Sequence, residues 1–204
     1  MNMISIIGAG SHTRSSINLL KDNFKESIFG IYDDSFNDKN KELIDDIYLQ
    51  GNIKSISNDS DIFLSIGDNK SRKLLFNKFN KQIIKENLFH KTSYLESDII
   101  IGNSNQVFAN TYINSFVSIR DNNIINTSAI LEHEVKIGSH NHISVGAKLC
   151  GRVIIGNNCM VGAGAIIIDK ISICDDVILG AGTVVIKNIS KSGTYVGNPA
   201  RKVK

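Results

Sequence analysis

The sequence predicts two domains of different class, an α/β Rossmann-like small domain in residues 1–85 and an all-β parallel β-helix in residues 86–204. Two observations predict this. Residues 1–85 alternate short β-rich runs with helical stretches, which indicates a parallel sheet covered by helices. From Leu95 onward every sixth residue is aliphatic. A period of six fits a three-sided coil with one inward side chain on each side.

The first domain is expected to follow a β-α-β-α-β-α order. Its predicted strands are Ile4–Ile7, Ile28–Tyr32 and Ile62–Ile66, and its predicted helices are His12–Lys21, Lys39–Leu49 and Asn69–Phe79. Ligands of such sheets bind at the carboxyl ends of the strands. Here these ends carry a Gly-Ala-Gly turn at 8–10, an Asp-Asp pair at 33–34 and a glycine at 67.

The second domain is predicted from an unbroken repeat. All positions at the six-residue spacing from Leu95 to Val185 are Leu, Ile or Val. Small or β-branched residues recur between them, as tight corners require. Three sides of six residues make a coil of about 18 residues, so the repeat predicts about five coils. Residue n therefore lies one coil below residue n+18.

Composition narrows the functional classes. The formal net charge is +3 and the sequence pI is about 8.7, which is too weakly basic to indicate nucleic-acid binding and fits a small acidic ligand at least as well. The three cysteines form no CxxC pair. The apolar start of the chain is too short for a signal peptide or a membrane span. We therefore expect a cytoplasmic protein without membrane insertion.

His133 and Glu134 are the first candidates for chemistry. His133 follows the inward Leu131 by two residues, so its side chain should point off the prism. Histidine is the expected general base near neutral pH, and an adjacent carboxylate can fix its tautomer. A solvated surface pair explains the dipeptide equally simply. Gly151 lies 18 residues on, where the lack of a side chain leaves room for a thioester and the N–H can stabilise an oxyanion.

Three other interpretations fit the residues less well. The spacing of His133, His140 and His142 does not match the histidine pattern of β-helix carbonic anhydrases, so no metal is expected. A nicotinamide site would need a third glycine where Thr13 stands. A non-catalytic β-helix scaffold would not need a His-Glu pair beneath a glycine, and a coenzyme A thiol-release assay separates it from an enzyme.

Motifs along the whole chain resemble the bacterial sugar acetyltransferases of the left-handed β-helix, or hexapeptide-repeat, superfamily. These include the UDP-4-amino-sugar N-acetyltransferases and the sialic acid O-acetyltransferases. The matching segments are GAGSH at 8–12, YDD at 32–34, IGDN at 66–69, NTS at 126–128, ILEHE at 130–134, HISVGAKLCG at 142–151 and VGNPA at 196–200.

In the β-helix, the resemblance implies a site for acetyl-CoA between the subunits of a homotrimer. His133 would be the catalytic base, Glu134 would tune it and Asn126 would lie near the reacting centre. The acetyl end of the co-substrate would be contacted by His142 and Gly151. Its pantetheine arm would run along Ala163 and Ala181, which are 18 residues apart and so stack in successive coils.

In the N-terminal domain, the resemblance implies that Gly10, Ser11, His12, Asp33, Asp34 and Gly67 contact a sugar nucleotide. A glycine turn before a helix presents backbone N–H groups to a phosphate. The expected reaction is N-acetylation of the 4-amino group of a UDP- or dTDP-linked 4-amino-4,6-dideoxy sugar in surface glycan biosynthesis. One alternative is an enzyme that O-acetylates a sialic-acid-like sugar, and the other is a non-catalytic β-helix assembly scaffold.

Overall fold

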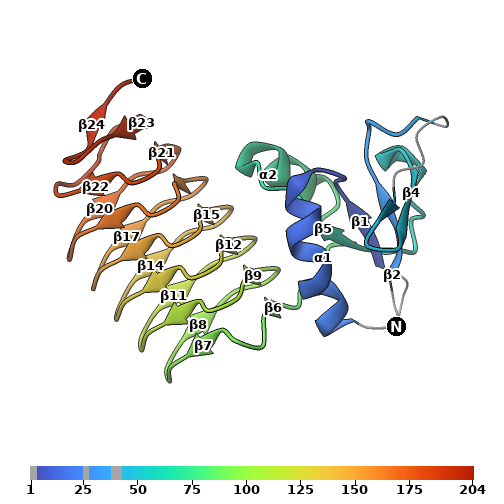
Figure 1. Ribbon diagram of the computed structural model, residues 1–204, viewed down its shortest axis with the longest axis horizontal. Helices are drawn as coiled ribbons and strands as arrows, with labels where there is room; N and C mark the ends of the chain where they lie inside the picture. Colours follow the sequence, from blue (N-terminus) through green and yellow to red (C-terminus); the bar gives the residue numbers. More distant parts are fainter. Residues whose placement is uncertain (1–3, 25–27, 38–42) are drawn as a thin grey trace. The chain divides into compact units, whose positions relative to one another are not determined.

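The computed structural model describes residues 4–24, 28–37 and 43–204 (Figure 1). The chain divides into two compact units, residues 1–88 and residues 89–204. The first unit contains a short-stranded α/β sheet and the second is a solenoid of two- and three-residue parallel strands ending in a short hairpin. The predicted fold class is confirmed for both parts of the chain.

The first unit is built on a five-stranded sheet in the order β3-β4-β2-β1-β5. Its strands are β1 (Ile4–Ile7), β2 (Ile28–Tyr32), β3 (Leu43–Ile44), β4 (Ile47–Gly51) and β5 (Asp61–Leu64), with helices α1 (Ser11–Asn23) and α2 (Asn69–Lys78) and a 3-10 turn at Ile53–Ser55. β1 pairs in parallel with β2 and β5, and β2 pairs in parallel with β4. All four residues of β1 are buried, as expected for a central strand covered on both faces.

The predicted helix at Lys39–Leu49 is wrong over its described part. Residues 38–42 lie outside the described residues, but residues 43–49 form β3 and the start of β4, which pair as an antiparallel hairpin. Asp45 and Asp46 form its turn at φ 48° and 64°. Two consecutive residues in the left-handed region suit a two-residue hairpin turn, where aspartate is favoured. The two aspartates between apolar residues therefore indicate a hairpin turn between two strands, not the interior of a helix.

The second unit is a three-sided parallel β-helix. One face contains β7 (Tyr94–Leu95), β10 (Tyr112–Ile113), β13 (Ile130–Leu131), β16 (Lys148–Leu149), β19 (Ile166–Ile167) and β22 (Val184–Val185). The next contains β8 (Ile100–Ile101), β11 (Ser118–Ile119), β14 (Lys136–Ile137), β17 (Ile154–Ile155) and β20 (Ser172–Ile173). The third contains β6 (Leu88–Phe89), β9 (Gln106–Val107), β12 (Ile124–Ile125), β15 (His142–Ile143), β18 (Met160–Val161), β21 (Val177–Leu179), β23 (Gly193–Val196) and β24 (Arg201–Lys202).

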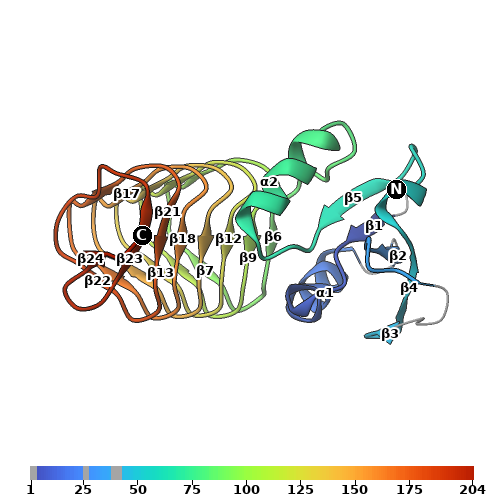
Figure 2. The same cartoon turned by 90° about the horizontal axis from the view of Figure 1, so that it is seen from above.

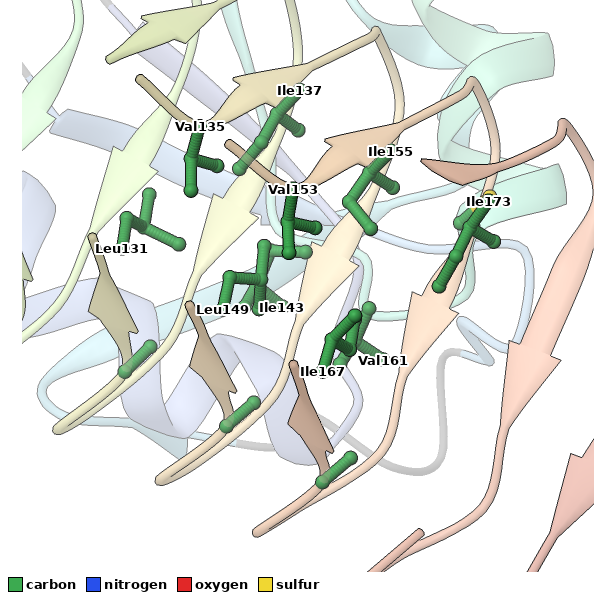
Figure 3. Close-up of a cluster of buried hydrophobic side chains, with 14 of the residues drawn as sticks. Leu131, Val135, Ile137, Ile143, Leu149, Val153, Ile155, Val161, Ile167 and Ile173 are labelled. Atoms are coloured by element: carbon green, nitrogen blue, oxygen red, sulfur yellow. The ribbon is translucent and has the colours of Figure 1, made fainter. Parts of the chain in front are cut away.

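The inward aliphatic residues form one continuous core. Strands 18 residues apart pair in register, as Ile113 with Leu131 and Leu131 with Leu149. Each of these three side chains is fully buried. Figure 3 shows the same stacking on the next face, where Ile137, Ile155 and Ile173 follow one another. Strands β7 to β21 make five complete coils, in agreement with the repeat length, and the coils lie side by side along the unit in Figure 2.

A ladder of buried asparagines stabilises one corner of the β-helix. Asn123 donates from Nδ2 to Oδ1 of Asn105 at 3.0 Å and accepts at its own Oδ1 from the N–H of Asn141 at 2.8 Å. Asn141 then accepts at Oδ1 from the N–H of Cys159. Buried backbone N–H groups need such partners, so these side chains supply hydrogen bonds where the chain turns.

Candidate active site

His133 lies on the turn between β13 and β14. Leu131, two residues earlier, is fully buried, whereas the His133 side chain is 43% exposed. His133 lies beyond the end of β13, in the turn, where the alternation of strand side chains no longer applies, so its side chain can face outward although it follows Leu131 by two residues. The structure therefore directs His133 away from the core, as predicted. We call the stacked turns 132–135, 150–153 and 168–171 the base corner.

Glu134 is paired with His133. The two side chains meet at 3.0 Å between Nδ1 and Oε2. Because an ionised carboxylate only accepts hydrogen bonds, Nδ1 carries the proton and the lone pair of a neutral imidazole lies on Nε2. The hydrogen bond from His133, followed by the charge of Arg152, holds the pKa of Glu134 below its usual value. The pair is thus arranged so that Nε2 is the nitrogen that can accept a proton.

Gly151 lies directly against the imidazole. A Cβ atom at this position would stand 2.6 Å from both Cε1 and Nε2 of His133 and 3.0 Å from Oδ1 of Asp169. The space that the missing side chain leaves is therefore occupied by the edge of the imidazole, where the sequence suggested room for a thioester. Within the described residues no carbonyl or side chain accepts from the Gly151 N–H. This N–H therefore has no acceptor in the described part of the chain, and it belongs to a residue that is buried beside the imidazole.

Arg152 extends the base corner by a further coil. Its Nε donates to Oε2 of Glu134 at 3.1 Å, and its Nη1 is 3.5 Å from Oδ1 of Asp169. Lys170 is in turn 3.5 Å from Oδ2 of Asp169. Sequence reasoning missed this arginine, although the 18-residue spacing that places Gly151 over His133 also places Arg152 over Glu134.

Asn126 and His142 form a second pair at a different corner of the same chain. The Nδ2 of Asn126 is 3.1 Å from Nε2 of His142, and its Oδ1 accepts from the N–H of Thr127 at 2.8 Å. With the amide oxygen so engaged, the NH2 group faces the imidazole, which accepts at Nε2. His142 is only 8% exposed. Along the chain β13 lies between Asn126 and His133, and β14 lies between His133 and His142.

Ala163 and Ala181 lie in the turns that follow β18 and β21, at the same corner as Asn126 after β12, and we call this the second corner. Both stack one coil apart, with the Gly182 N–H donating to the carbonyl of Ala163 at 2.8 Å. Gly164 and Gly182 follow them at φ 65° and 66°, and a Cβ at either glycine would meet open space. The corner therefore presents a strip of small residues and accessible backbone, which an extended acyl chain can follow.

Gly10, Ser11 and His12 form the start of helix α1. Gly10 is the N-cap and supplies no side-chain cap, and a Cβ there would meet nothing within 4 Å. The first turn of the helix contains no acidic residue. Uncapped N–H groups at the positive end of a helix dipole favour an anion. The phosphate contact at this loop stays a prediction.

Asp33 holds the glycine loop in place. Its Oδ2 accepts from the N–H of Ala9 and its Oδ1 from the N–H of Ser35, each at 2.9 Å. Burial raises the pKa of Asp33, but the hydrogen bonds from Ser35 and Ala9 outweigh it and keep this pKa below its usual value. The carboxylate therefore orders the loop from the neighbouring strand end.

Gly67 lies next to His12, since a Cβ added to this glycine would stand 3.6 Å from the Cβ of the histidine. Behind it, the fully buried Arg72 donates to the carbonyls of Ile66 and Gly67 at 3.0 and 3.3 Å. Burial lowers the pKa of Arg72 to about 9. The structure thus brings the loops after β1 and β5 together. Arg72 holds the loop after β5 in place, and sequence reasoning missed this residue.

Asp34 lines a pocket of about 500 Å³ together with Asn52, Lys54 and Ser55. Asp34 follows β2 and Asn52 follows β4, so the pocket lies at the carboxyl ends of two parallel strands, where such sheets bind ligands. Asn52 and Lys54 escaped the sequence-based prediction because β4 was interpreted as part of a helix.

Metal clusters and membrane-spanning helices are two further features that a chain of this kind can carry. Within residues 4–24, 28–37 and 43–204 no group of three or more His, Cys, Asp or Glu side chains is arranged to hold a metal ion. No helix among the described residues has the length and apolar character needed to cross a membrane.

Two protein-family models match this chain, one in each unit. The model of the PglD N-terminal domain matches residues 3–79, and the model of the bacterial transferase hexapeptide (six repeats) matches residues 152–187. A search of curated proteins finds no match.

Solved structures match the whole chain. The acetyltransferase domain of PglB from Neisseria gonorrhoeae FA1090 is 25% identical, with 100% of both chains covered and a TM-score of 0.87, and it has also been solved in complex with acetyl coenzyme A. A histidine-to-alanine variant of GDP-perosamine N-acetyltransferase from Caulobacter crescentus, in complex with CoA and GDP-perosamine, is 26% identical, covers 100% of this chain and 98% of its own, and has a TM-score of 0.88. WeeI from Acinetobacter baumannii AYE shares the fold at 17% identity, with 100% of both chains covered and a TM-score of 0.66.

Proposed function

We propose that this chain, whose predicted resemblance to the hexapeptide-repeat sugar acetyltransferases is confirmed by both comparisons, N-acetylates the 4-amino group of a nucleotide-linked 4-amino-4,6-dideoxy sugar. The enzyme class and the acetyl-CoA donor follow from its structural neighbours. The observation that carries the proposal is the base corner, where His133 is held by Glu134 and packs against Gly151.

His133 is the general base of the proposed reaction. The acceptor amine attacks the carbonyl carbon of the acetyl thioester as Nε2 of His133 removes its proton. When the C–S bond breaks, the resulting imidazolium can return that proton to the sulfur of coenzyme A. Glu134 stabilises the transient imidazolium through its hydrogen bond to Nδ1. General base catalysis of this kind contributes about 10²- to 10⁴-fold in rate.

Gly151 is the proposed oxyanion donor. Its N–H is not engaged within the described residues and belongs to the residue that touches the imidazole. A fixed backbone donor aimed at the thioester oxygen stabilises the negative charge that develops there without reorganising during the reaction.

The second corner supports the binding of acetyl-CoA. When bound, acetyl-CoA supplies an activated acetyl group on a long thioester arm. The strip at Ala163 and Ala181 offers backbone polar groups and no bulky side chains to such an arm. We assign the acetyl end of the arm to His142 and Gly151, with Asn126 orienting His142 by their 3.1 Å contact.

A homotrimer would complete this site. In one chain His133 and Gly151 lie at the base corner, whereas Asn126, His142, Ala163 and Ala181 lie at the second corner, on the other side of the β13 face. Rotational packing of identical prisms brings different corners of neighbouring copies together. Coexpression of His133→Ala with His142→Ala tests this sharing. Random mixing should restore about a quarter of the activity, whereas no recovery, or a monomer by ultracentrifugation, would contradict it.

The N-terminal domain is proposed to hold the nucleotide. The start of α1 at Gly10, Ser11 and His12 suits the diphosphate, with Gly67 packed beside it. Asp34 and the pocket beside it suit the ribose or base, and Asp33 orders the loop. Acetylation of such a sugar would serve surface glycan biosynthesis.

An acceptor screen tests the proposal. Acetyl-CoA is offered with UDP-, dTDP- and GDP-linked 4-amino sugars and with free sialic acid, and products are detected by mass together with thiol release. We expect an N-acetylated nucleotide sugar. Acetylation of sialic acid alone would assign O-acetyl transfer instead. If no acceptor causes release of the coenzyme A thiol, the result would favour a non-catalytic β-helix scaffold.

A further inference from the structure

Arg152 shares the carboxylate oxygen that holds His133. Oε2 of Glu134 accepts from Nδ1 of His133 at 3.0 Å and from Nε of Arg152 at 3.1 Å. The other end of the guanidinium lies 3.5 Å from Asp169. Arg152 thus lies between the carboxylates of Glu134 and Asp169, and the three residues belong to three successive coils. It contacts Glu134 at Oε2, the same atom that pairs with the imidazole.

From this geometry we propose that Arg152 is a positioning residue that sets the pH at which His133 becomes a free base, acting through Glu134. The proposal rests on the proposed role of His133 as the base. A carboxylate with no other partner would strongly favour the imidazolium form. A carboxylate whose charge is already countered by a guanidinium favours the imidazolium less, so Arg152 weakens the effect of Glu134 on His133.

Four charged side chains of the base corner form a ladder whose formal charges sum to zero, and Glu132 adds one further negative charge at the same corner. Glu134, Arg152, Asp169 and Lys170 alternate in sign along the ladder. Glu134 is the hydrogen-bond partner of the imidazole in the described part of the chain. The titratable and charged groups on these turns and the strands beside them are Glu132, Glu134, Lys136, Lys148, Cys150, Arg152, Asp169 and Lys170.

The other groups at the corner have different partners. Glu132 accepts from Nδ2 of Asn114 at 2.8 Å. Burial raises the pKa of Cys150, with further contributions from Glu132 and Asp169, so this thiol stays neutral near pH 7. Arg152 is therefore the cation that acts on the His133–Glu134 pair directly.

The test compares Arg152→Gln with Lys170→Gln. Both remove one positive charge from the same ladder, but only the first removes a partner of Glu134. For Arg152→Gln we expect the acid limb of the kcat/KM profile, and the NMR titration of the His133 ring proton, to move to higher pH by roughly half a unit. Lys170→Gln should leave both nearly in place, and Arg152→Lys should restore the wild-type profile. Added salt should shrink the difference because the groups are partly exposed.

The outcomes separate this proposal from the catalytic one. An unmoved or downward-shifted His133 titration in a folded Arg152→Gln variant would overturn the role of Arg152. Loss of activity at all pH values without a shift would mean that Arg152 only maintains the corner. The NMR titration needs no turnover, so it remains informative even if His133→Ala keeps wild-type activity and thereby refutes His133 as the base.

Discussion

Substitution of Gly151 by alanine separates catalytic geometry from folding. The added Cβ would stand 2.6 Å from Cε1 and Nε2 of His133. Carbon atoms in contact prefer about 3.5 Å, so the ring must move by roughly 1 Å. A displacement of this size in a catalytic group costs about 100-fold in rate. We therefore expect kcat to fall by about two orders of magnitude.

The stability of the variant should change little. Gly151 is not among the residues with positive φ, so alanine fits its backbone. The displaced imidazole is 43% exposed and can turn toward solvent. Replacement of glycine by alanine at a compatible position stabilises by about 0.4–1 kcal/mol through the unfolded chain, which offsets the strain of moving the ring.

The assay pairs thiol-release kinetics with thermal unfolding. The matched control is the double variant His133→Ala/Gly151→Ala. If the new methyl acts only by displacing the imidazole, it will have almost no effect once the imidazole is gone. Full activity in Gly151→Ala would refute the contact argument. An equal loss from Gly151→Ala in both backgrounds would instead mean that the methyl acts independently of the imidazole, for example by blocking the thioester.

Three more predictions follow from the contacts. Glu134→Gln removes the charge that stabilises the His133 imidazolium, so the acid limb of the kcat/KM profile should move to lower pH, and an upward shift would argue against the pairing. Asn123→Ala removes the acceptor of the Asn141 N–H inside the β-helix and should cost about 2–3 kcal/mol in urea unfolding; a loss below about 0.5 kcal/mol would discount the ladder. The lowered pKa of Asp33 means that its stabilisation is full above the unfolded-state pKa and is lost as pH falls through the folded-state value. Asp33→Asn should therefore flatten the acid side of the stability profile, which unfolding at several pH values measures.

The β-helix was predictable because one rule fixes it. Each coil buries one aliphatic side chain per face, so the repeat from Leu95 to Val185 determined strand positions and register. The same rule correctly placed Gly151 over His133 and would have found Arg152. Charge ladders on the surface leave a weaker signal than the core, because exposed positions tolerate many residue types.

The N-terminal sheet was less predictable. Leu43, Ile44 and Leu49 fit a helical spacing and a hairpin about equally well, and tertiary pairing with β2 decided for strands. Without β4, the pocket residues Asn52 and Lys54 had no expected place. Arg72 was also missed, since an arginine on an amphipathic helix is usually exposed. Its burial is explained by the loop carbonyls and the Asn69 side chain to which it donates.

The most direct test of the central claim is the turnover of His133→Ala on the acceptor that the screen identifies, with the dissociation constant of coenzyme A measured on the same sample. The account predicts a fall in kcat of about 10³-fold with coenzyme A affinity unchanged. Turnover within a few-fold of the wild type would contradict it.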